Sequence, residues 1–268
     1  MVAVRELALE YKRAAAAASG PDRVPAVADI TCQFRTAAIS AIVGPSGCGK
    51  TSIVQAIAGL LAPSTGDISI EGMPVRGVRP RTAVIFQDFG LLPWRTVEGN
   101  AELPLVIAGI RRSERRRRVD PVLRELGLSA FRSFFPAGLS GGMKQRVAIA
   151  RALVSEPDLL LMDEPFSSLD ALTREAAQEF LLQVRCSRPM TIILVTHSIE
   201  EAVYLAETVF VMSGRNPGTM RKRFDIPENR FESRFLTDFR SSQRYLELCG
   251  AIRAALRESG RTDDGAVQ

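Results

Sequence analysis

Two kinds of apolar pattern alternate along the chain. Short runs that are apolar throughout, such as 39–43 and 191–196, predict strands buried on both faces of a sheet. Longer segments with apolar residues three and four positions apart predict amphipathic helices over 51–61, 171–185 and 199–206. Further strands are predicted over 2–9, 67–71, 82–86, 159–162 and 208–212. Strands that alternate with helices in this way predict an α/β fold with a mostly parallel sheet.

This alternation is interrupted between residues 96 and 155, where the pattern is helical throughout. Breaks in the helices are expected at Pro104, Pro121 and 136–138. We interpret the helix-rich part, about 90–155, as a subdomain inserted into the α/β core.

The two ends of the chain carry weaker patterns. A turn-rich loop is predicted over 14–25 and a turn over 216–218. A charged amphipathic helical stretch follows over 230–258, and the last eight residues are expected to fray. We therefore divide the chain into a main domain, 1–225, and a C-terminal helical extension, 226–268, which is either a packing appendage or a regulatory element.

Composition excludes several classes of protein. The chain has 268 residues and is 46% apolar, which is enough for a full hydrophobic core. It has 4 cysteines, none in a CxxC pair, and 1 histidine, so neither a zinc cluster nor a disulfide framework is expected. Charged residues interrupt the first twenty positions, and no apolar run reaches the 18 or so residues of a membrane helix, so we expect neither a signal peptide nor a membrane span.

The net charge of +5 is concentrated in one place. The segment 111–118 holds six arginines and one glutamate, so the rest of the chain sums to zero. A protein that coats nucleic acid is more evenly basic, and no nucleic-acid partner is expected. We interpret this basic strip as a solvated helix flank, or as a surface that meets anionic lipid headgroups.

A glycine-rich turn carries the clearest chemistry. It follows the apolar strand 39–43, opens a helix and fits the pattern G-x-x-x-x-G-K-[ST] with Gly44, Pro45, Ser46, Gly47, Cys48, Gly49, Lys50 and Thr51. Its backbone N–H groups surround phosphate oxygens, while the lysine reaches the β- and γ-phosphates and the threonine hydroxyl binds Mg²⁺. The alternative is a glycine-rich turn with an accidental lysine.

Acidic and imidazole side chains follow two other apolar strands. Asp163 and Glu164 end the strand 159–162, where one carboxylate can hold Mg²⁺ through water and the other can activate the attacking water. They could instead be acids that cap a helix before Pro165. His197 follows the strand 191–196, and it either touches the γ-phosphate or is an ordinary surface or core histidine.

These motifs resemble those of the ABC ATPases. The segment 139–146, Leu-Ser-Gly-Gly-Met-Lys-Gln-Arg, is similar to the family's LSGGQ signature. Gln87 matches the Q-loop, 167–170 the D-loop and His197 the H-loop, and Tyr11 lies where the family places an aromatic that stacks on adenine. The resemblance covers about residues 2–225. It implies a P-loop NTPase (RecA-like) core with an N-terminal antiparallel β subdomain and an inserted α-helical subdomain.

The resemblance also implies ligands and roles. ATP and Mg²⁺ would be the cofactors, with catalytic roles for Lys50, Gln87, Glu164 and His197. Mg²⁺ would be held by Thr51, Gln87 and Asp163. The nucleotide would be bound by the P-loop residues above and by Tyr11, Ser52, Ser140, Gly141, Gly142 and Asp170. The family's head-to-tail dimer would place the Ser140–Gly142 signature of one copy on the ATP of the other.

A narrower resemblance points to import. The segment 90–97, Gly-Leu-Leu-Pro-Trp-Arg-Thr-Val, followed by Asn100, is similar to nitrate, sulfonate and taurine importer ATPases, in which the part near Trp94 receives a helix of the permease. This implies a peripheral ATPase on the cytoplasmic face of the inner membrane, with an integral permease and, indirectly, a substrate-binding protein as partners. The alternatives are a soluble ABC ATPase that acts on nucleic acid or ribosomes, and the ATPase of a lipid or efflux transporter.

Overall fold

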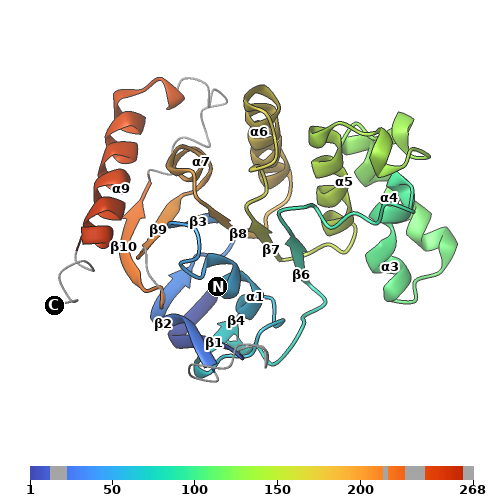
Figure 1. Ribbon diagram of the computed structural model, residues 1–268. Coiled ribbons are helices and arrows are strands. Elements are labelled where there is room, and N and C mark those ends of the chain that lie inside the picture. Colours follow the sequence, from blue (N-terminus) through green and yellow to red (C-terminus); the bar gives the residue numbers. More distant parts are fainter. Residues whose placement is uncertain (13–22, 214–216, 227–238, 262–268) are drawn as a thin grey trace, which may run out of the picture. The chain divides into compact units, whose positions relative to one another are not determined.

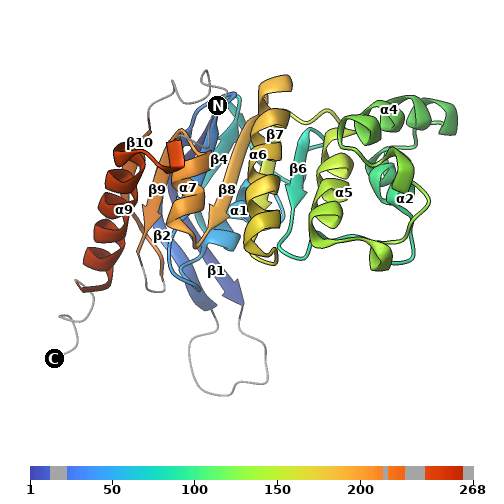
Figure 2. The same ribbon diagram turned by 90° about the horizontal axis from the view of Figure 1, so that it is seen from above.

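The computed structural model describes residues 1–12, 23–213, 217–226 and 239–261. The chain forms two compact units, one made of residues 1–79 with 191–268 and the other of residues 80–190. Figures 1 and 2 show the elements of each. Parts of the loop predicted over 14–25, the turn over 216–218 and the helical stretch over 230–258 lie outside the described residues, as do all but the first of the last eight residues.

An antiparallel sheet in the first unit has the strand order β2-β1-β4-β5. Its strands are β1 (Val2–Lys12), β2 (Arg23–Phe34), β4 (Thr65–Ile70) and β5 (Met73–Pro74). The side chains of β2 alternate between buried and exposed from Ile30 to Phe34, as expected of a sheet with one covered face.

A second sheet of the first unit is mostly parallel. β3 (Ile39–Val43) lies between β8 (Thr191–Thr196) and β9 (Thr208–Met212) and pairs in parallel with both. β10 (Met220–Asp225) adds an antiparallel edge to β9. Every residue of β3, β8 and β9 is buried, which explains why these strands are apolar almost throughout.

Three helices cover this mostly parallel sheet. α1 (Lys50–Ile57) packs against β8 and β2, and α7 (Ile199–Leu205) packs on β3 and β8. Figure 1 shows α1 and α7 on opposite faces of the sheet. α9 (Gln243–Arg261) packs against α7, β9 and β10.

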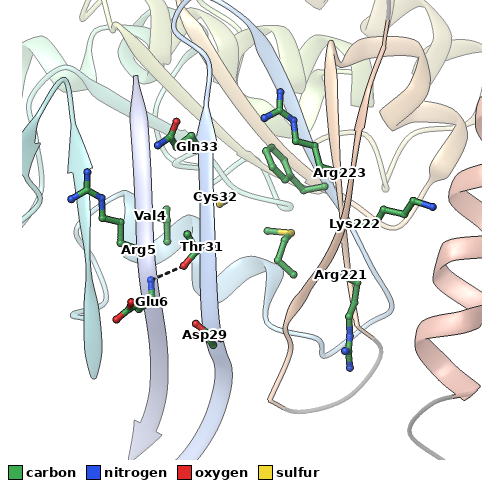
Figure 3. Close-up of a pocket in the computed structure, with 12 residues that line it drawn as sticks. Val4, Arg5, Glu6, Asp29, Thr31, Cys32, Gln33, Arg221, Lys222 and Arg223 are labelled. Atoms are coloured by element: carbon green, nitrogen blue, oxygen red, sulfur yellow. Dashed lines mark hydrogen bonds between the residues drawn. The ribbon is translucent and has the colours of Figure 1, made fainter.

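The two sheets of the first unit meet through Phe34 of β2 and Phe210 of β9, whose rings contact edge to face at 5.1 Å. A bridge between Val27 and Gly218 also joins β2 to the segment before β10. Beyond this bridge a groove of about 690 Å³ separates β2 from β10, with Cys32 on one side and Arg221 on the other (Figure 3). It contains none of the residues that the sequence predicts for the nucleotide site.

The second unit combines two parallel strands with a group of helices. β6 (Thr82–Ile85) pairs with β7 (Leu159–Asp163), in the register Ile85 to Met162. The helices are α2 (Val97–Ala101), α3 (Leu103–Ile107), α4 (Arg112–Glu125), α5 (Gly141–Leu153) and α6 (Ala171–Ser187), with 3-10 turns at Ser129–Phe131 and Pro136–Gly138. The helices from 97 to 153 fall in the stretch interpreted as an inserted subdomain, and the domain boundaries at 90, 155 and 225 stay predictions.

Three predictions from the sequence were wrong. Helix α4 continues through Pro121, so that proline does not end a helix. The loop expected up to Pro25 ends earlier, because β2 begins at Arg23; a proline is tolerated there since β2 is an edge strand. β2 and β10 were not predicted as strands at all, and β10 exposes three basic residues in succession, which masks its alternation.

Candidate functional site

The glycine-rich turn connects β3 to α1, as the sequence predicts. Gly47 and Gly49 have φ angles of 81° and 92°, in the left-handed region that favours glycine. A Cβ on Gly49 would also lie 2.3 Å from the Cγ1 of Val27. α1 begins at Lys50 without a side-chain hydrogen bond at its N-cap, so the N–H groups of its first turn are not occupied by a capping side chain. The conformation is that of an anion-binding turn.

The side chain of Lys50 folds back over this turn. It is 95% buried, and its Nζ donates to the carbonyl oxygens of Gly44 and Pro45 at 2.9 and 2.8 Å. Burial raises the pKa of the neighbouring Cys48 thiol, against the opposing charge of Lys50. Cys48 therefore contributes a backbone N–H to the turn rather than thiolate chemistry. Thr51 is exposed at the start of α1.

Tyr11 of β1 is anchored to the helix that follows the glycine-rich turn. Its hydroxyl lies within hydrogen-bond distance of Ser52 Oγ at 2.9 Å and of Gln55 Oε1 at 3.3 Å. The side chain of Ser52 is buried, while Tyr11 is 42% exposed. The structure thus brings Tyr11, Ser52 and the start of α1 together, and the ring keeps an accessible surface for stacking.

His197 lies at the same edge of the mostly parallel sheet as the glycine-rich turn. β3 and β8 end side by side, with Val43 paired to Thr196. The exposed His197 follows directly, and α7 begins after Ser198. Because carboxyl ends of parallel strands share one edge, the first unit brings together Lys50 and His197 on neighbouring connections.

The backbone around His197 is fixed by three hydrogen bonds. The buried Thr196 hydroxyl donates to Glu201 Oε2 at 2.7 Å and accepts from the N–H of Ser198 at 3.0 Å. Ser198 in turn caps α7 by accepting from the N–H of Glu201 at 3.1 Å. His197 could be predicted from its place after an apolar strand, whereas this network was not predicted, although a capping serine three residues before a glutamate indicates part of it.

The acidic pair lies in the second unit, at the carboxyl end of β7. Asp163 is buried at the end of the strand, and Glu164 follows with a φ of 46°. A left-handed backbone is uncommon for glutamate, although Glu6, Glu71 and Glu156 adopt it as well. The Ser167 hydroxyl donates to the Glu164 carbonyl at 2.9 Å and holds the turn. Gln87 is exposed after β6, at the same edge as Asp163 and Glu164.

The signature segment opens α5 and packs tightly against the D-loop. Ser140 caps α5 by accepting from the N–H of Met143 at 3.3 Å. A Cβ on Gly141 would lie 2.8 Å from Leu169, and one on Gly142 would lie 2.8 Å from Thr173. The sequence indicated small residues at a helix start, but their close packing on the D-loop could not be read from it.

Asp170 begins α6 beside the signature. Its carboxylate accepts from the N–H of Thr173 at 3.0 Å. Hydrogen bonds from the hydroxyl and the N–H of Thr173 hold the pKa of Asp170 below its usual range. The carboxylate is therefore ionised at neutral pH and exposed.

The segment around Trp94 is a preorganised loop in the second unit. The fully buried Asn100 accepts from the N–H of Leu92 at 2.8 Å, and its Nδ2, with two N–H groups to donate, lies 3.0–3.1 Å from the carbonyl oxygens of Leu92, Arg95 and Thr96. Trp94 is nevertheless 71% exposed. A large aromatic side chain on a rigid loop is typical of an interface rather than of a core.

The basic strip lies at the start of α4 in the second unit. Arg115 pairs with Glu102, Arg117 and Arg118 both pair with Glu114, and Arg116 pairs with Asp120. Glu102 and Asp120, the two partners outside the strip, offset only part of its net positive charge, and both interpretations of the strip stay predictions.

The described part of the chain contains neither a membrane-spanning helix nor a cluster of metal-binding side chains. None of its helices is long and apolar enough to cross a membrane. No three His, Cys, Asp or Glu residues gather there in a way that could hold a metal ion.

Comparison with known proteins identifies the class of protein. Residues 27–167 match the family model of the ABC transporter, and the chain belongs to this family. The dimeric ATP-binding cassette MJ0796, in a post-hydrolysis state bound to ADP and Pi, is a structural neighbour with a TM-score of 0.71 and 28% identity, over 85% of this chain and 99% of that one. The predicted α/β P-loop fold is confirmed, and the chain is an ABC-type ATPase that binds ATP.

Named relatives narrow the comparison. The taurine import ATP-binding protein TauB of Yersinia pestis bv. Antiqua (strain Antiqua) is 45% identical over 202 residues, which is 75% of this chain and 79% of that protein. The TauB protein of Rhizobium johnstonii is 45% identical over 219 residues, or 81% of this chain and 83% of that protein. The family predicted from the motifs is therefore confirmed.

Proposed function

We propose that this chain is the ATPase subunit of an importer that takes up a small anion such as a sulfonate, taurine or nitrate. The observation that carries the proposal is the 45% identity to proteins named for taurine import, over about three quarters of the chain. The exposed Trp94 on its rigid loop supports it, since an importer ATPase needs a docking surface for its permease.

The first unit supplies the phosphate-binding groups. The N–H groups from Gly44 to Thr51 would surround the phosphates of ATP, and the Lys50 ammonium would leave its two carbonyl partners for the β- and γ-phosphates. Tyr11 would stack on the adenine. The hydroxyl of Thr51, with Gln87 and Asp163 of the second unit, would hold Mg²⁺, which neutralises charge on the phosphates when bound.

Glu164 is our candidate for the group that activates water. It directly follows β7, and its carboxylate would accept a proton from the attacking water. His197, held by the Thr196–Glu201–Ser198 network, would contact the γ-phosphate, and Gln87 would orient the water.

A second copy of the chain completes each site in this proposal. Ser140, Gly141 and Gly142 of one copy would contact the γ-phosphate bound by the other, and Asp170 would lie at the same interface. The dimeric state of MJ0796 supports a head-to-tail dimer. ATP would close the dimer and hydrolysis would open it, which drives the attached permease.

The partners follow from the same proposal. An integral membrane permease would bind the Trp94 loop, so the chain would lie peripherally on the cytoplasmic face of the inner membrane. A substrate-binding protein would act on the other side of that permease. The transported anion would not touch this chain.

The test uses a tagged Glu164→Gln chain, because this variant should bind ATP and keep the dimer closed on its partners. It is expressed in the native cells and purified with ATP from detergent-solubilised membranes. We expect a hydrophobic, multi-span protein to copurify, and a Glu164→Gln/Trp94→Ser chain to lose it. The binding protein of that system is then titrated with taurine, other sulfonates and nitrate.

Two results would overturn parts of the proposal. If only soluble proteins or nucleic acid copurify, the role as an importer subunit is refuted. The ATPase activity would then serve another process. A permease whose binding protein ignores all three anions would keep the importer and refute its cargo.

A further inference from the structure

The C-terminal helix α9 is part of the first unit's core. Its residues Leu248, Ile252 and Ala255 are buried and follow one another at helical spacing. This face packs against α7, β9 and β10. Figure 2 shows α9 running alongside β10 and next to α7.

Two polar side chains of α9 converge on a single residue of α7. The Tyr245 hydroxyl donates to the backbone carbonyl of Glu200 at 3.1 Å. Arg253, two turns further on, donates from Nη2 to Glu200 Oε1 at 2.7 Å. Burial raises the pKa of Tyr245, so its hydroxyl stays a donor. Backbone and side chain of Glu200 are thus both held from α9.

The other end of α7 is held as well. The guanidinium of Arg240 lies 3.7 Å from the centre of the Tyr204 ring. Phe239 contacts the ring of Tyr245 edge to face at 5.5 Å. Arg240, which precedes α9, therefore contacts the last turn of α7 at Tyr204. Residues of α9 itself contact the first turn of α7 at Glu200.

Glu200 is three residues from His197. Between them, Ser198 hydrogen-bonds to Glu201 and also reaches Glu200 Oε2 at 3.4 Å. An exposed ion pair such as Arg253–Glu200 adds little stability by itself, so its effect is on position. A shift of Glu200 would move the turn that carries His197.

We propose that α9 positions His197, with Tyr245 and Arg253 acting as positioning residues through Glu200. This rests on the proposed function only for the role of His197 in hydrolysis. The C-terminal extension then sets the turnover rate of the ATPase, and a ligand or protein that displaces α9 would slow it.

The test exploits the fact that His197 is the only histidine of the chain. A full-length chain labelled with ¹³C,¹⁵N-histidine gives a single imidazole signal in a purification-tag-free sample. We compare a Tyr245→Phe/Arg253→Ala chain with an Arg257→Ala control. Arg257 is also an exposed arginine of α9 and forms no ion pair with any described residue.

We expect the double variant to shift or broaden the imidazole signal and to lower kcat by about tenfold with an unchanged KM for ATP, since a misplacement of about 1 Å can cost up to a hundredfold. The control should match the wild type in both. If the double variant has the same melting temperature as the Arg257→Ala control and its imidazole signal is unchanged from the wild type, the proposal is overturned. If the imidazole signal moves in the double variant but the wild-type chain has no ATPase activity, the role of His197 in hydrolysis is refuted. The proposal that α9 positions His197 then still stands.

Discussion

Arg151 binds the backbone on the C-terminal side of Gln87, at Phe89. Its Nη2 donates to the Phe89 carbonyl at 2.6 Å and its Nη1 to the Gly90 carbonyl. Both Phe89 and Gly90 have left-handed backbones, with φ angles of 63° and 56°. Arg151 lies near the end of α5, whose start is the signature segment, so one helix joins the signature to the Q-loop.

Replacing Arg151 by alanine should destabilise the chain. Burial lowers the pKa of Arg151, and the side chain tolerates this because two carbonyls accept its hydrogen bonds. Their loss should cost about 2–4 kcal/mol in urea unfolding. Arg151→Lys keeps the positive charge but cannot donate to both carbonyls from two guanidinium nitrogens. It should therefore lose about half as much stability as Arg151→Ala. Equal stabilities of Arg151→Ala and wild type would contradict this account.

Asn100→Ala should unfold the Trp94 loop. The hydrogen bonds of a fully buried side chain to the backbone of the loop are lost, and we expect a loss of about 3 kcal/mol in stability. Asn100→Asp keeps the acceptor for Leu92 but removes the donors. If Asn100→Asp were as stable as the wild type, the N–H groups of the Asn100 side chain would not be what holds the loop. Fluorescence of Trp94, the chain's 1 tryptophan, reports on the loop directly.

Gly49→Ala should damage the phosphate-binding turn more than Gly47→Ala. Both glycines have positive φ, but a Cβ on Gly49 would collide with Val27, whereas a Cβ on Gly47 would meet nothing within 4 Å. Gly47→Ala should therefore cost only the backbone strain of about 1 kcal/mol, and Gly49→Ala should also abolish ATP binding. Calorimetric titration with ATP checks both. Equal affinities would mean that the collision is relieved.

The cysteines should differ in reactivity and in their pH dependence. Cys186 is exposed, whereas Cys32, Cys48 and Cys249 are buried, so mass spectrometry should show that iodoacetamide at pH 7.5 labels Cys186 first.

Burial raises the pKa of Cys32 from 9.0 to about 12. Its contribution to stability is therefore complete below pH 9 and is lost as the pH rises toward 12. Cys32→Ala should flatten this alkaline loss in Tm, and an unchanged slope would assign it to other groups.

The buried strands could be predicted from the sequence because burial dictates their composition. β8 and β9 begin and end at the predicted residues, and β7 extends one residue further to include Asp163. Two other strands, β2 and β10, could not be predicted. β2 contains Pro25 and β10 exposes charged side chains, since neither strand is covered on both faces.

The same contrast holds for the candidate site. The glycine-rich turn and Glu164 were found because their residue types and spacing follow directly from phosphate chemistry. Arg151 and the bonds of Asn100 act on backbone carbonyls, and no residue pattern marks a carbonyl as a partner.

The contact between the signature glycines and the D-loop has a consequence for how these segments vary. Gly141 and Gly142 lie so close to Leu169 and Thr173 that neither segment can change size without moving the other. A mutational scan should therefore find that larger residues at either glycine become tolerable only together with smaller ones at Leu169 or Thr173. The two segments therefore have to change together. A chimaera that takes its signature from another ATPase must also take the D-loop of that ATPase.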